Sequence, residues 1–366
     1  MTNKLFRSKR AIAAVIAAVL IIGIYAFRSP ILQRVIEFAV NHRLTNSTVT
    51  NLPDGLHVGL CGAGSQLLVD PKRSEPCVFV LAGKNLFIVD AGNKSTQLIE
   101  SMGFGAGEVK VVLLTGTNSY RINGLGQLLN WNWMLSRNDE PTPVFGPEGV
   151  AEIVAGLQQA YIADSRYKIS QLGANALKSK GFGGRSITVK FSSPSELLTI
   201  IKSPDLEVMA FPKDRFPEEP GISYVFRYKG RSVVISGDTA KSENVQRHAK
   251  DVDLLVHDAL SPTLMGFYID GAAKSGMTNV VEIFTKMVSQ HATPEEAALT
   301  ATHAGAKYLL LTGITPPLQL PGAEGIFLGD ATKQFKGPLR IGEDGDMISM
   351  PANSTDMSRS SIISRF

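Results

Sequence analysis

Apolar and polar positions along the chain predict repeated strand pairs. Residues 77–92 (CVFVLAGKNLFIVDAG) contain two apolar runs around a turn at Gly83 and Lys84, which predicts a β-hairpin. Residues 222–239 (ISYVFRYKGRSVVISGDT) repeat this pattern around Lys229-Gly230. Three shorter apolar runs, VKVVLLTG (109–116), DLLVHDA (253–259) and KYLLLTG (307–313), are typical of strands buried on both faces.

One helix between the last two buried strands carries clear start and stop signals. Thr293 suits the N-cap, Pro294 the first turn, and Glu296 completes a capping box. We expect this helix to run to His303 and to end at Gly305. Strands with polar loops at their ends, separated by helices, predict an α/β domain with two sheets sandwiched between helices, over residues 56–350.

The N-terminus has the pattern of a membrane anchor. A basic segment, residues 1–10, precedes an uncharged run over residues 11–27 (AIAAVIAAVLIIGIYAF). At about 1.5 Å per residue the run reaches across a thin hydrocarbon core. The basic residues should stay in the cytoplasm, so the chain after Arg28 should be exported. We predict an uncleaved signal anchor; the alternatives are a cleaved signal peptide and a buried core helix.

The segments flanking the domain are less regular. Residues 28–55 are expected to form a stalk helix and a linker, with helical apolar spacing over residues 31–44. We prefer docking of this helix on the domain to a position on the membrane surface. Residues 351–366 are serine-rich without a period, and we expect a disordered tail.

Composition narrows the function classes. The chain has 366 residues, 44% of them hydrophobic, and a net charge of +4, which gives no indication of nucleic-acid binding. Its two cysteines exclude a cysteine-rich zinc module. Cys61 and Cys77 flank a turn-rich stretch, and in an exported chain they are candidates for a disulfide, the alternative being two buried thiols. None of the six histidines lies between Val58 and Arg247.

Several ordered sequence blocks carry a family resemblance. They read LHVGLCGAGS, NLFIVDAG, VVLLTGTNSYRINGLGQLL, AFPKDRFPEEPGISYVFRYKGRSVVISGDT, LLVHDA and HATPEEAALTATHAGAKYLLLTGITPP. In this order they resemble the metallo-β-lactamase superfamily, in its tRNase Z and arylsulfatase-like branch, and more narrowly its exported, membrane-anchored members. The resemblance implies a four-layer αββα sandwich behind one N-terminal transmembrane helix. It also implies hydrolysis, often of phosphodiesters, by water held between two zinc ions.

The family's metal ligands do not carry over. The resemblance aligns the ligand positions with Gly116, Asn118, Tyr120, Arg121, Arg215, Asp238 and Gly313. Only Asp238 keeps a ligand side chain, since glycine has none and arginine does not lose its proton. We therefore expect no cofactor, the zinc pair being lost, and with it the family's route to a metal-activated water.

The altered pocket suggests new roles for its residues. We hypothesise that Arg121 and Arg215 pair with Asp238 in place of the metals; a variant of this idea is that both arginines and Asn118 hold an anion. His291 matches a family proton donor, and His257 matches a second family histidine. Either they remain general acids, or, as we prefer, each bonds a loop backbone and holds the sheet ends in place.

Together these inferences predict a membrane-anchored pseudoenzyme. Its role would be to bind a small anion or a protein partner at a bacterial inner membrane, with its C-terminal domain facing the periplasm and with homodimerisation open. No nucleic-acid partner is expected. The alternative is an active hydrolase, phosphodiesterase- or arylsulfatase-like, that uses an altered or single-metal site at Asp238 with His257 or His291.

Overall fold

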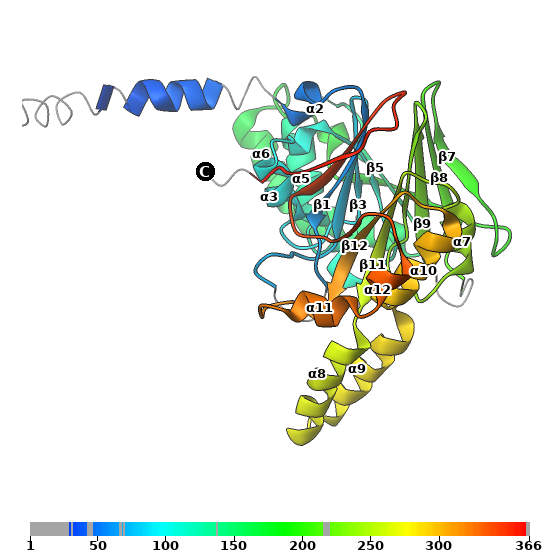
Figure 1. Ribbon diagram of the computed structural model, residues 1–366. Coiled ribbons are helices and arrows are strands. Elements are labelled where there is room, and N and C mark those ends of the chain that lie inside the picture. Colours follow the sequence, from blue (N-terminus) through cyan, green and yellow to red (C-terminus); the bar gives the residue numbers. More distant parts are fainter. Residues whose placement is uncertain are drawn as a thin grey trace, which may run out of the picture. The chain divides into compact units, whose positions relative to one another are not determined.

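The computed structural model describes residues 29–30, 32–41, 47–65, 68, 70–136, 138–214 and 220–363 (Figure 1). The chain divides into two compact units, Met1–Ser47 and Thr48–Phe366. In the first unit, residues 29–30 and 32–41 are helical. None of the helices among the described residues is long and apolar enough to cross a membrane. The predicted anchor at 11–27 and the basic segment 1–10 lie outside the described residues.

The second unit contains two mixed sheets. The first has eight strands in the order β15-β14-β1-β2-β3-β4-β5-β6. The second has seven, in the order β13-β12-β11-β10-β9-β8-β7. The first sheet comprises β1 (Gly55–Gly62), β2 (Cys77–Ala82), β3 (Asn85–Val89), β4 (Val109–Leu113), β5 (Thr142–Gly146), β6 (Gly184–Thr188), β14 (Asp346–Pro351) and β15 (Ser358–Ser361). The second comprises β7 (Leu198–Lys202), β8 (Leu206–Pro212), β9 (Ile222–Tyr228), β10 (Arg231–Ile235), β11 (Leu254–Leu260), β12 (Tyr308–Thr315) and β13 (Leu339–Ile341).

Helices cover the outer faces of both sheets (Figure 1). The first sheet is flanked by α3 (Ser95–Ser101), α5 (Leu125–Leu135) and α6 (Val150–Leu172), and the second by α7 (Glu243–His248), α10 (Pro294–Ala304), α11 (Ala323–Leu328) and α12 (Ala331–Gln334). The shorter helical segments are α2 (Thr48–Asn51), η1 (Ala106–Glu108), α4 (Ser119–Ile122) and η2 (Ser179–Gly181). Helices α8 (Pro262–Lys274) and α9 (Thr278–Gln290) pack on each other and project from the sandwich as an arm (Figure 1).

Three hydrophobic clusters fill the layers. Val58, Val80 and Val256 belong to the cluster between the two sheets. A second cluster joins the first sheet to its helices, and a third joins the second sheet to α7, α10, α11 and α12. The predicted sandwich of two sheets between helices is confirmed.

Two predicted boundaries need correction. The tail expected to be disordered from Pro351 instead forms β15, which pairs antiparallel with β14. Ile362 and Ile363 pack against the second core cluster, and Arg359 pairs with buried Asp346. The linker predicted to extend to residue 55 also ends earlier, since the second unit begins at Thr48, whose hydroxyl donates to the carbonyl of Met102.

Candidate functional site

The candidate site lies where loops follow the carboxyl ends of strands from both sheets. Asp90 follows β3, α4 follows β4, and Asp238 follows β10. Asp258 and Gly313 lie within the last residues of β11 and β12, which are parallel neighbours. Side chains that are far apart in the sequence therefore converge at one end of the sandwich, the usual position for a site in such a fold.

Arg121 lies at the centre of this cluster. Its side chain is fully buried, and its guanidinium donates from Nη1 to Asp90 and from Nη2 to Asp258 Oδ2 at 2.8 Å. Nη2 also lies 3.9 Å from Asp238 Oδ2. Burial alone would lower the pKa of Arg121, but Asp90 and the other neighbouring charges outweigh it and raise this pKa well above its usual value. One fixed positive charge thus joins carboxylates from both sheets.

The first of these carboxylates is held tightly by its surroundings. Asp90 accepts hydrogen bonds from the Thr115 backbone N–H at 2.8 Å and from the Thr115 hydroxyl at 2.7 Å. Its backbone φ of 58° lies in the left-handed region, which a non-glycine residue adopts only where the surrounding structure holds it there. Asp90 is therefore fixed in place both by its backbone and by its side chain.

Asp238 is engaged at both oxygens. Tyr120 donates its hydroxyl to Oδ2 at 2.7 Å, and His291 Nε2 lies 2.9 Å from Oδ1. The other ring nitrogen of His291 donates to the carbonyl of Met287 at 2.8 Å. Because both ring nitrogens face acceptor oxygens, the contacts fit the doubly protonated imidazolium. His291 thus bonds the backbone of the last turn of α9, and not of a loop as we expected, and it also contacts a carboxylate.

The pKa values of this pair move in opposite directions. Burial alone would lower the pKa of His291, but the hydrogen bond to Asp238 and its charge outweigh burial and raise it. Burial alone would raise the pKa of Asp238, but His291, with Lys213 and Arg121, outweighs burial and lowers it. Both shifts favour the charged forms, so the contact between the two groups favours an ion pair.

His257 has a different environment. It is fully buried in β11, where Nδ1 donates to the carbonyl of Asp258 at 2.7 Å. Its Nε2 has no hydrogen-bond partner, and burial lowers its pKa, so the ring is neutral. His257 is not among the residues that line the cavity at the site.

Little space remains between these side chains. The cavity at the site has a volume of about 10 Å³, room for about one water molecule. Its lining residues are Ser65, Pro76, Tyr120, Arg121, Asp238, Asp258, Met287, His291, Gly313 and Thr315. A Cβ at Gly313, whose φ is 57°, would lie 2.7 Å from Asp258 Cγ, so a larger residue is excluded there unless Asp258 moves.

The remaining predicted positions lie differently. Asn118, the N-cap residue of α4, is exposed, and its Oδ1 would lie 3.1 Å from a Cβ placed at Gly116. Arg215 lies outside the described residues. Among the residues that the structure describes, no group of three or more His, Cys, Asp or Glu side chains is arranged to hold a metal ion. The described side chains therefore do not fit a zinc pair.

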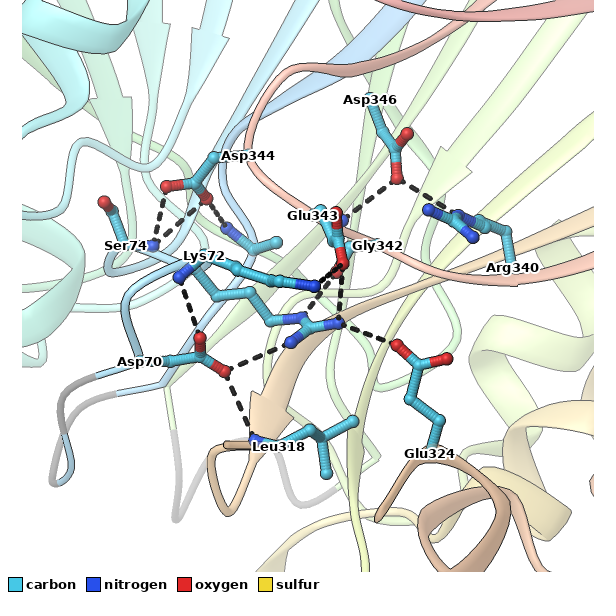
Figure 2. A network of polar contacts seen from close by, with 12 residues as sticks. Asp70, Lys72, Ser74, Leu318, Glu324, Arg340, Gly342, Glu343, Asp344 and Asp346 are labelled. Atoms are coloured by element: carbon cyan, nitrogen blue, oxygen red, sulfur yellow. Dashed lines mark hydrogen bonds and ion pairs between the residues drawn. The ribbon is translucent and has the colours of Figure 1, made fainter. Parts of the chain in front are cut away.

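A second polar network fixes the loop beside the site (Figure 2). Buried Arg73 donates to the carbonyl of Gly342 at 2.7 Å and to Asp70 Oδ2 at 3.1 Å. Asp70 also accepts from the Leu318 backbone N–H at 3.2 Å, and Asp344 accepts from that of Ser74 at 2.8 Å. These contacts tie the segment between β1 and β2 to the residues that follow β12 and β13. Since Ser65 and Pro76 of this segment line the cavity, the network holds one wall of the site in place.

The cysteines lie at the ends of this same loop. Cys61 in β1 and Cys77 in β2 form a disulfide, with their Cα atoms 4.8 Å apart. The described residues contain no free cysteine. The bridge and the polar network therefore restrain the loop together.

Comparison with known proteins places the fold. No family model matches the chain. It is similar to the short form of human tRNase Z, with a TM-score of 0.55 at 20% identity, covering 81% of this chain and 99% of that one. It is also similar to the metallo-β-lactamase fold protein YhfI from Bacillus subtilis, with a TM-score of 0.56 at 16% identity, covering 81% and 100%. The chain thus has the metallo-β-lactamase fold.

Sequence similarity relates the chain to one branch of the proteins with this fold. The ribonuclease Z of Mycolicibacterium gilvum (strain PYR-GCK) is 29% identical over 294 residues, 79% of this chain and 94% of that protein. The ribonuclease Z of Mycobacterium bovis (strain BCG / Pasteur 1173P2) is 28% identical over 297 residues, 79% and 96%. The chain is a metallo-β-lactamase-fold protein related to the ribonuclease Z branch.

Proposed function

We propose that this chain is a non-catalytic member of the metallo-β-lactamase fold that has lost the zinc pair and acts as a binding module. The observation that carries this proposal is the position of Arg121. Its guanidinium lies where Asp90, Asp258 and Asp238 converge. A fixed positive charge at this point neutralises carboxylates that would otherwise be buried without a counterion.

The polar groups of the site already contact one another, which argues against an active hydrolase with an altered site. Asp238 accepts a hydrogen bond from Tyr120 at Oδ2 and lies in ion-pair contact with His291 at Oδ1, and both ring nitrogens of His291 face acceptors. A general base needs a free lone pair within reach of a water molecule, and His291 offers none in this arrangement. The charge of Asp238 is already compensated by His291 and Arg121, which lowers its pKa and weakens it as a base. His257 Nε2 is free but fully buried.

The same geometry favours a protein partner over a small anion. Arg121 directs both terminal nitrogens at carboxylates, and the cavity of about 10 Å³ is too small for a phosphate or a carboxylate ligand. Binding would then use the outer surface of the domain. The projecting arm offers exposed apolar side chains there, among them Phe267 at 66% and Met277 at 53% exposure.

We further propose that the protein is exported and anchored in the membrane by residues 11–27. The basic segment followed by an apolar run supports this localisation. The disulfide between Cys61 and Cys77 supports it independently, because disulfides persist in oxidising compartments.

Metal analysis combined with hydrolysis assays tests the loss of catalysis. The purified full chain should hold no stoichiometric zinc, manganese or iron. It should hydrolyse neither bis(p-nitrophenyl) phosphate nor p-nitrophenyl sulfate, under conditions in which an active phosphodiesterase and an active arylsulfatase, assayed as positive controls, turn these substrates over. Near-stoichiometric metal, or turnover abolished by a chelator, would refute the proposal.

A further inference from the structure

The helix in the first unit exposes an apolar stripe. Leu32, Val35, Ile36 and Val40 lie at the spacing i, i+3, i+4, i+8, which places them on one face. Their exposed fractions are 58%, 56%, 52% and 49%. The opposite face carries Arg34, Glu37 and Asn41, with Gln33 and Phe38, which is 73% exposed, at its two edges. A helix with this division has an apolar side that needs a cover.

The sequence before the helix indicates which surface is close enough to cover its apolar side. The apolar run ends at Phe27, two residues before Ser29, which is the first described residue and is helical. Even a fully extended chain advances only about 3.5 Å per residue. If residues 11–27 span the bilayer, the first described residues of the helix therefore lie at the layer of lipid headgroups.

Length and charge agree with a position along that layer. The described residues of this helix do not meet the requirements for a membrane span. Arg28, Arg34 and Arg43 outnumber Glu37, so the segment has a net positive charge that complements anionic phospholipids.

We propose that this helix lies on the surface of an anionic membrane, with Leu32, Val35, Ile36 and Val40 toward the acyl chains. The inference rests on the proposed anchoring and replaces our sequence-based preference for docking on the domain. The helix would then hold the start of the domain linker at the membrane surface, which limits how far the domain can move from the bilayer.

Spin labels on the full chain in vesicles of phosphatidylcholine and phosphatidylglycerol test this position. Labels enter through Val35→Cys and Ile36→Cys on the stripe, and through Arg34→Cys and Glu37→Cys as matched controls on the polar face. Cys61 and Cys77 are paired and do not take the label. We expect the stripe labels to be more accessible to oxygen, which partitions into lipid, and the control labels to a water-soluble nickel chelate.

Other results separate this inference from the anchoring on which it rests. Stripe labels protected from both reagents would mean that protein, from this domain or a second copy, covers the stripe. Equal exposure of both faces to the nickel chelate would mean that nothing covers it. Either result overturns the inference while the chain still sediments with the vesicles. A chain that does not sediment with vesicles would refute the anchoring itself.

Discussion

At the scale of single residues, the site depends on one arginine whose partners are remote in sequence. Asp90 and Asp258 are 31 and 137 residues away from Arg121. The sequence predicted pairing of Arg121 with Asp238, which is the longest of the three contacts at 3.9 Å. It missed the two closer partners because the ends of strands from different sheets meet only in the folded chain. The position of Asp90 at the end of a buried strand was the one signal in the sequence that pointed to these partners.

Substitution of Arg121 measures the strength of this arrangement. Arg121→Ala leaves buried carboxylates without a counterion, and we expect a loss of about 3–5 kcal/mol in the free energy of unfolding, measured by urea denaturation. The control is Arg185→Ala, an exposed arginine, for which a change within about 0.5 kcal/mol is expected. Millimolar guanidinium should raise the melting temperature of Arg121→Ala and leave that of the wild type unchanged. Equal losses in the two variants would contradict the assigned role of Arg121.

At the scale of elements, signals within a few neighbouring residues predicted the structure well, whereas contacts with remote parts of the chain were not predicted. The capping box of α10 and its end at Gly305, with a φ of 70°, are confirmed because a helix end depends on a few neighbouring residues. The hairpin turn between β2 and β3 is confirmed for the same reason. Strand β15 was missed, since its serine-rich sequence has no apolar period. It pairs with β14, the strand directly before it, while Ile362 and Ile363 beyond it pack against the second core cluster, which is remote in the sequence.

Helix α9 shows how an element outside the sandwich is tied to the site. His291 follows its last residue, donates to the carbonyl of Met287 in its last turn, and reaches Asp238. A protonated histidine at a helix C-terminus also interacts favourably with the helix dipole. The arm formed by α8 and α9 is therefore joined to the sandwich through a titratable ion pair.

This contact makes stability depend on pH. The pKa of His291 is raised above its ordinary value of 6.5, so its contribution is complete below 6.5 and is lost as the pH rises through the raised value. The pKa of Asp238 is lowered, so its contribution is lost only in acid, as the pH falls below 3.8. His291→Gln should therefore destabilise the protein more at about pH 5.5 than at about pH 9. Thermal unfolding of this variant and of His303→Gln, an exposed control, at both pH values checks this; a loss independent of pH would exclude the ion pair.

At the scale of the whole molecule, the N-terminal segment and the domain carry separate indications of the same compartment. The apolar run at 11–27 indicates export from the sequence alone. The disulfide joins β1 to β2 at the centre of the first sheet, and the Asp70–Arg73 contact holds the loop that it closes. A domain built around this bridge is expected to fold to full stability only where cysteines are oxidised.

Deleting residues 1–28 separates the effect of compartment from the effect of sequence. In a Gram-negative host, the shortened chain should stay in the cytoplasm with Cys61 and Cys77 reduced. Because both are buried, they should react once the protein is denatured, with a maleimide reagent that shifts the mobility of the chain on a gel. The full chain should show no shift until a reductant is added. The reduced form loses the restraint on a loop of 16 residues, worth about 3 kcal/mol, and should melt at a lower temperature until it is oxidised in vitro. A full chain whose cysteines are alkylated without reductant would refute export of the domain, because both thiols would then have remained in a reducing compartment.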